Sequence, residues 1–66
     1  MTVIVNGEER TVNEKSTLLE LMQTLGLEGK VMAAAVNMNI VKKEMWDKHQ
    51  LNTDDKVELL DFVGGG

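Results

Sequence analysis

One stretch of this sequence has the clear period of an amphipathic helix. Its apolar residues recur at intervals of three and four: Leu18, Leu21, Met22 and Leu25. That spacing places them on one face of a helix. Thr17 and Glu20 fit a capping box at its start, and Gly26 is placed to end it in a left-handed conformation, with Leu27 folding back on the last turn. Since so short a helix is marginal alone, we expect its apolar face to pack on a sheet.

Segments with strand-like patterns lie on both sides of this helix. We expect strands at residues 2–6, 8–12, 31–36 and 56–63, with a brief one at 40–41. Asn6-Gly7 between the first two is a strong hairpin signal, because both residues tolerate positive φ. The second segment is polar enough for a sheet edge, and the last is the most hydrophobic, as expected at the centre of a sheet. The order is therefore β-β-α-β-(β)-β.

This order predicts an α+β protein with the β-grasp, or ubiquitin-like, fold. One helix covers one face of a mixed sheet of about four or five strands. The first and last strands are the most apolar, and we expect them to pair in parallel at the centre. A chain of 66 residues allows one domain. We predict a folded domain over 1–63 and a flexible glycine tail over 64–66.

Composition excludes several functions. The sequence has no cysteine, which excludes disulfides, thiolate metal sites and a cysteine nucleophile. The net charge of −4 and the pI near 4.8 argue against nucleic acid and anionic membranes as partners. His49 is the only histidine, and a metal site is not expected. No signal peptide or membrane span is visible, so the default location is the cytoplasm.

The chain resembles the ThiS family, the small sulfur carriers of thiamine thiazole biosynthesis. The resemblance covers the whole chain and rests on these segments: Val3-Ile4-Val5-Asn6, Leu18-Leu19-Glu20-Leu21-Met22, Val36-Asn37 followed by Ile40-Val41, Trp46, and the closing strand into Gly65-Gly66. The part from Val36 to Trp46 is the most specific. Lys42 stands where the family often has proline, and Gly64 extends the usual Gly-Gly to three glycines.

The resemblance implies a carrier that partner enzymes act on, without a cofactor of its own. The carboxylate of Gly66 would be adenylated by an E1-like enzyme of the ThiF type and converted to a thiocarboxylate. A thiazole synthase of the ThiG type would then take the sulfur. Gly64 and Gly65 would let the tail enter a narrow channel, where a Cβ would clash. The residues agree, because no phosphate-binding glycine loop and no recognisable catalytic constellation is present.

Alternating residues of the last strand predict a docking surface. If Val57 and Leu59 face the helix, Leu60 and Phe62 face away from it. Ile4 of the first strand would join them in an apolar patch leading to the tail. A contiguous exposed apolar patch suggests a site for a protein partner, and ubiquitin-like proteins commonly use this face. Glu58 and Asp61 flank the patch and would steer it toward a basic partner, or they are simply solvated charges.

Other readings stay open. The carrier would serve molybdopterin (MoaD-like) or sulfur amino-acid synthesis by the same tail chemistry, or the chain is a non-covalent ubiquitin-like binding module. Terminal glycines are also often frayed ends. We expect a monomer when the protein is free. Among the remaining residues, we expect Trp46 to close one end of the core, Met22 and Met32 to fill it, His49 to have a surface or loop-packing role, and Asp54-Asp55 to form a turn rather than a calcium loop.

Overall fold

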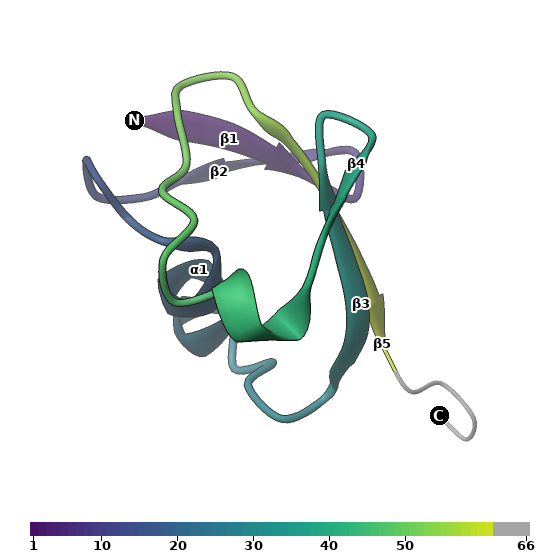
Figure 1. Cartoon of the computed structure of the whole chain (residues 1–66). Helices are drawn as coiled ribbons and strands as arrows, with labels where there is room; N and C mark the ends of the chain where they lie inside the picture. Colours follow the sequence, from purple (N-terminus) through teal and green to yellow (C-terminus); the bar gives the residue numbers. More distant parts are fainter. Residues whose placement is uncertain (62–66) are drawn as a thin grey trace.

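The computed structural model describes residues 1–61 and shows one helix packed on one face of a five-stranded sheet (Figure 1). In chain order the elements are β1 (Thr2–Val5), β2 (Glu8–Thr11), α1 (Leu18–Thr24), β3 (Val31–Val36), β4 (Asn39–Val41), the 3-10 helix η1 (Lys43–Met45) and β5 (Lys56–Asp61). The predicted β-grasp arrangement is confirmed, including the brief fourth strand. Phe62, Val63 and the predicted tail 64–66 lie outside the described residues.

The sheet has the order β2-β1-β5-β3-β4. β1 and β5 run parallel, with Ile4 opposite Lys56 and Val5 opposite Val57, while the other neighbouring pairs are antiparallel. The predicted parallel pairing of the first and last strands is therefore confirmed, and β2 is an edge strand, as predicted. β5 lies at the centre of the sheet, so the strand that leads toward the tail is held from both sides.

Both ends of α1 have the signals that the sequence predicted. At the start, the Glu20 N–H donates to Thr17 Oγ1 (3.1 Å) and the Thr17 N–H donates to Glu20 Oε1 (2.8 Å). At the end, Gly26 has a φ of 72°. The Gly26 N–H donates to the carbonyl of Gln23, and the Leu27 N–H to that of Met22. These two bonds form a Schellman motif, which explains how so short a helix ends cleanly.

The loop between β4 and β5 braces the start of α1. The carbonyl oxygens of Trp46 and His49 accept hydrogen bonds from the Leu19 and Leu18 N–H groups, each at 2.9 Å. These donors have no partner within the helix, because they belong to its first turn. The loop thus caps the helix with its own backbone, to which His49 contributes its carbonyl oxygen.

The core lies between α1 and the sheet. Its buried apolar residues are Val3, Val5, Leu18, Leu21, Met22, Val31, Ala34, Val36, Val41, Trp46, Leu51, Val57 and Leu59. The indole N–H of Trp46 donates to the carbonyl of Val41 (2.8 Å), so this residue closes the core beside β4, as predicted. Within residues 1–61, no helix is long and apolar enough to span a membrane.

The expectation that Met32 fills the core is wrong, since 53% of this residue is exposed. The cause is an irregularity in the β3–β5 pairing. Val31 lies opposite Asp61 and Ala33 opposite Leu60, so two steps along β3 match one step along β5. The extra residue of such a bulge leaves the normal alternation. Met32 is therefore turned outward, although a regular strand pattern would not predict this.

Candidate functional site

The candidate site is the face of the sheet that α1 leaves open, on the strand leading to the tail. Along β5, Val57 and Leu59 are buried, whereas Lys56, Glu58 and Leu60 are exposed. This alternation confirms the predicted facing of Val57, Leu59 and Leu60. Phe62, predicted to extend the patch, and Gly64, Gly65 and Gly66, predicted to carry the chemistry, lie outside the described residues, so their roles stay predictions.

A groove of about 350 Å³ lies on this open face. Its lining residues come from β3, β4, β5 and the β1–β2 turn: Asn6, Ala33, Ala34, Ala35, Ile40, Glu58, Leu59 and Leu60. Strand pairing explains its shape. Ala33 lies opposite Leu60, and Ala35 lies opposite both Glu58 and Ile40. The small side chains of Ala33 and Ala35 form the floor, since that of Ala34 lies in the core, and the larger side chains on either side form the walls.

The walls of this groove are apolar side chains that remain accessible. Ile40 is 73% exposed and Leu60 is 57% exposed. Glu58 brings a carboxylate among them, and it forms no ion pair within the described part of the chain. An apolar hollow containing one unpaired charge has the features of a protein contact surface, with the charge giving specificity more than affinity.

Two of the predicted docking residues lie apart from this groove. Ile4 is on the open face, but its neighbour on β5 is Lys56, and it does not line the groove. Asp61 lies opposite Val31 at the end of β5 and is half-buried. In the strand alternation Asp61 shares the side of Leu59, whereas Glu58 shares the side of Leu60. The structure therefore brings together Glu58 and Leu60 in the groove, whereas Ile4 lies outside the groove on the neighbouring strand and Asp61 lies on the other side of β5.

Asn6 holds β5 in place where β1 ends. Its side chain accepts a hydrogen bond from the Leu59 N–H (2.9 Å) and donates one to the Leu59 carbonyl (3.3 Å). The chain has already turned into the β1–β2 hairpin at this point, with φ of 49° at Asn6 and 86° at Gly7. The amide group therefore substitutes for the next residue of β1. These two hydrogen bonds hold the backbone of β5 at Leu59, two residues before the end of the described chain.

Sequence reasoning missed Ile40 and the alanine floor. The sequence pattern predicted that a brief fourth strand exists, but it did not predict the direction in which its middle residue, Ile40, points. The run Ala33-Ala34-Ala35 was visible as a cluster of small residues. Such a cluster on a strand beside the most apolar one is the signal that could have predicted a hollow at this place.

The predicted turn at Asp54-Asp55 is present, but the second aspartate has a further structural role. Asp55 is buried, and its carboxylate accepts hydrogen bonds from Asn37 Nδ2 (2.9 Å) and the Asn52 N–H (2.7 Å). Asn37 also accepts from the Lys56 N–H through its side-chain oxygen (2.9 Å). This network fastens the β3–β4 hairpin to the start of β5. No group of side chains in residues 1–61 is arranged to hold a metal ion.

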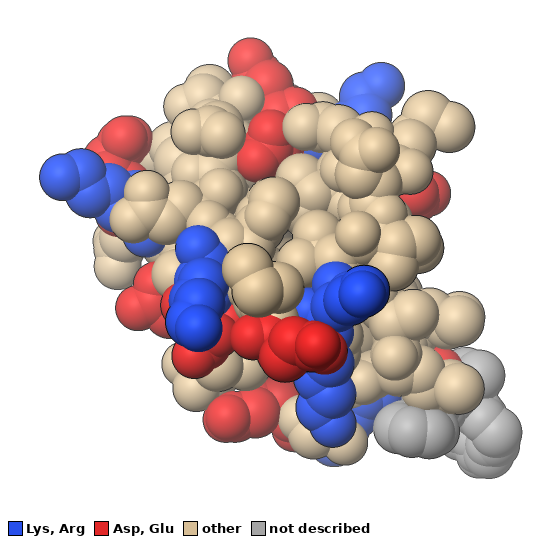
Figure 2. Space-filling model, viewed as in Figure 1, with Lys and Arg blue, Asp and Glu red and all other residues tan. Residues whose placement is uncertain are grey.

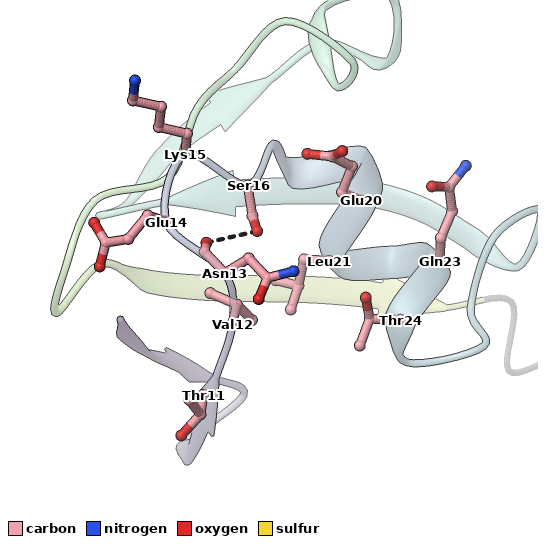
Figure 3. Close-up of a pocket in the computed structure, with 10 residues that line it drawn as sticks. All are labelled: Thr11, Val12, Asn13, Glu14, Lys15, Ser16, Glu20, Leu21, Gln23 and Thr24. Atoms are coloured by element: carbon pink, nitrogen blue, oxygen red, sulfur yellow. Dashed lines mark hydrogen bonds between the residues drawn. The ribbon is translucent and has the colours of Figure 1, made fainter.

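A larger hollow of about 500 Å³ lies on the other side of the molecule, between α1 and the loop after β2 (Figure 3). Its walls are mostly polar, and Ser16 donates a hydrogen bond to the Asn13 carbonyl within it (2.7 Å). The ammonium of Lys15 and the carboxylate of Glu14 point outward in this view. None of the predicted site residues lines it, and its polar groups present no convergent set for a ligand.

Charge is mixed on the molecular face seen in Figure 1. Figure 2 shows Lys and Arg side chains interspersed with Asp and Glu, and largely uncharged atoms over the β3–β4 hairpin at the upper right. A surface with both signs interspersed creates no strong field of one sign. The net charge of −4 is therefore not gathered into one acidic patch on this face.

Comparison with known proteins identifies the family. The model of the ThiS family matches residues 3–66. This chain belongs to the ThiS family. Its fold agrees, because the crystal structure of a thiamine biosynthesis protein (ThiS) from Geobacter metallireducens superposes with a TM-score of 0.82 at 31% identity, covering 100% of both chains.

Two curated relatives of this ThiS-family chain differ in length. The sulfur carrier protein ThiS of Bacillus subtilis (strain 168) is 30% identical over 63 residues, covering 94% of this chain and 96% of the relative. A thiazole synthase of Paramagnetospirillum magneticum is 35% identical over 66 residues, and this chain spans only 20% of its length. A segment similar to this chain thus occurs within a longer protein named for thiazole synthesis.

Proposed function

We propose that this protein is a sulfur carrier of thiamine biosynthesis that is acted on by partner enzymes and is not itself a catalyst. The observation that carries this proposal is the family match over residues 3–66, which extends into the glycine tail. The curated sulfur carriers of Bacillus subtilis and Escherichia coli, 30% and 27% identical to this chain, support it. The cysteine-free sequence requires that any transferred sulfur be held on another group.

The proposed group is the terminal carboxylate of Gly66. A carboxylate is a poor electrophile, and adenylation by an E1-like enzyme of the ThiF type gives it a leaving group. A persulfide sulfur then attacks the acyl carbon, AMP departs, and cleavage of the sulfur–sulfur bond by a thiol reductant leaves a thiocarboxylate. Gly64 and Gly65 allow the tail to enter the channel of the enzyme, where any Cβ would clash.

In this proposal residues 1–63 form the domain that docks and 64–66 the tail that reacts. Docking uses the open face of β5, where Glu58 and Leu60 lie in the groove. We include Phe62 and Ile4 as the outer part of this surface, and Asp61 as a charge at the end of β5, although it lies on the side of Leu59. The oriented tail then meets its nucleophile at high effective concentration.

The acceptor of the sulfur is a thiazole synthase of the ThiG type. The similarity of this chain to segments of two thiazole synthases, 35% and 30% identical, supports this choice. When a carrier domain and its acceptor enzyme belong to one polypeptide, each meets the other at a high effective concentration. We place the protein in the cytoplasm, where its partners require ATP and reduced sulfur.

The experiment is intact-mass measurement of the purified protein after incubation with ATP, a persulfide sulfur source and the cognate ThiF-type enzyme. We expect the mass to increase by the difference between one sulfur and one oxygen. Treatment with hydroxylamine or an alkylating reagent should then modify the protein at its C-terminus only. A variant lacking Gly65-Gly66 is the matched control and should gain nothing. If the mass of the full chain stays unchanged although the enzyme is active and ATP is present, the proposed function is overturned.

A further inference from the structure

The tip of the β3–β4 hairpin carries a residue in an unfavourable conformation. Val36 lies opposite Asn39, so the loop consists of Asn37 and Met38, whose φ values are 51° and 70°. Positive φ at both central residues is the requirement of a type I′ turn, and the second position strongly favours glycine. A side chain with a Cβ there loses stability relative to glycine.

Packing does not explain the choice of methionine. Met38 is 88% exposed, so its side chain contributes almost nothing to the core. Asn37 makes an instructive contrast, because its side chain bonds to Asp55 and to the Lys56 N–H. One residue of the turn thus has a structural reason to be there, and the other lacks one within the described molecule. Backbone outliers of this kind motivate a search for function.

The hairpin leads from this tip into the open-face groove. Ile40, two residues after Met38, lines the groove together with Glu58 and Leu60. Leu60 is followed by Asp61, the last described residue of β5. A protein that receives the tail therefore covers the end of β5, and the groove gives it a continuous path from there to Ile40 and the hairpin.

We propose that Met38 and Ile40 form a contact surface for the enzyme that activates the tail, and that Met38 determines specificity for that enzyme. The partner surface is apolar and carries a basic side chain that pairs with Glu58 in the groove. Position supports this occupant, because the groove begins at Leu60 beside the end of β5, where the enzyme that receives the tail must lie, and its one carboxylate, Glu58, forms no ion pair within residues 1–61. The inference rests on the proposed function and extends its docking surface from β5 to β4.

The decisive variant is Met38→Gly, because the structural and the functional readings predict different results. Glycine removes the strain of the turn, so the thermal unfolding midpoint is expected to rise by a few degrees. In a pyrophosphate-release assay with the cognate ThiF-type enzyme, the KM for the carrier is expected to rise about fivefold, as for a moderate contact residue at an interface. Ile40→Ser is expected to raise the KM about tenfold, with little change in stability.

Met45→Ala is the matched control. Met45 is also an exposed methionine, but it belongs to η1 rather than to the groove or the hairpin. Its KM should equal that of the wild type. Glu58→Gln tests the charge separately, since it should raise the KM at low salt and weaken the salt dependence of the KM.

The possible outcomes separate this inference from the proposed function. If the wild-type chain gains sulfur but Met38→Gly and Ile40→Ser keep the wild-type KM, the hairpin has no role in docking and only this inference fails. If the wild type gains no sulfur, both fail. If sedimentation shows a wild-type dimer that the two variants abolish while their KM is unchanged, the surface belongs to a second copy of the chain and the assignment to the enzyme is overturned.

Discussion

The two sides of β5 differ in what their residues do, although they alternate along the same six residues. Val57 and Leu59 face α1 and are buried in the core, whereas Glu58 and Leu60 face outward into a groove. Leu59 is 7% exposed and its neighbour Leu60 is 57% exposed. One strand therefore supports the domain with one set of side chains and presents a contact surface with the other, and the two roles can be changed separately.

The largest expected effect is on the buried side. Leu59→Ala should lower the free energy of unfolding by about 3 kcal/mol, because a buried leucine side chain is lost and a cavity remains. Urea denaturation followed by the fluorescence of Trp46 measures this change. In a domain with so small a core, such a loss is a large part of the total stability. A loss below about 1 kcal/mol would contradict the assignment of Leu59 to the core.

A smaller effect is expected at Asn6, which joins the two sides by bonding to the Leu59 backbone. Asn6→Gly should cost about 1–2 kcal/mol through the two lost hydrogen bonds, while keeping the positive φ accessible. Asn6→Ala should cost about 1 kcal/mol more, because alanine is disfavoured at positive φ. Thermal unfolding of the pair compares them. Equal stability of Asn6→Gly and the wild type would show that the side chain does not hold β5.

A substitution at the start of α1 tests the helix that covers the buried side of β5, with a smaller expected loss of stability. Thr17→Ala removes the capping side chain and should destabilise the protein by about 1 kcal/mol. Thr53→Ala, in an exposed turn, is the matched control and should change stability by less than about 0.5 kcal/mol. Chemical denaturation of both variants measures the difference. Similar values for the two would mean that the backbone of the 46–49 segment alone suffices to cap the helix.

The smallest effect on stability is expected on the outer side. Leu60→Ala should change the free energy of unfolding by less than about 0.5 kcal/mol. The same variant should raise the KM for tail activation about tenfold, if the groove is the docking surface. Together with Leu59→Ala, it tests the separation of roles on adjacent residues. If Leu60→Ala is destabilised but keeps the wild-type KM for tail activation, Leu60 supports the fold and does not belong to the docking surface.

Local patterns predicted most of the fold. The capping box at Thr17 and Glu20, the glycine at position 26 and the Asn6-Gly7 turn each specify a backbone conformation through their own chemistry, and the structure has all of them. The parallel pairing of β1 and β5 followed from hydrophobicity, because the most apolar strands lie at the centre. These features depend on a few adjacent residues or on a simple rule of burial.

The candidate site was predicted only in part, because it depends on contacts between strands. Alternation placed Leu60 on the open face, but only the register puts Ala33 and Ala35 beside Leu60 and Glu58 and so creates the groove. The bulge that exposes Met32 depends on how β3 and β5 fit together. The positive φ of Met38 follows from a two-residue loop in which methionine takes the place preferred by glycine, and no propensity predicts that choice.

The parallel contact between β1 and β5 has a consequence for synthesis of the protein in the cell. Val5 cannot meet Val57 until the chain has been synthesised through β5, so the centre of this sheet closes only after the other elements of the domain have been made. A fragment of this domain that ends before β5 therefore cannot form the central parallel pair of strands.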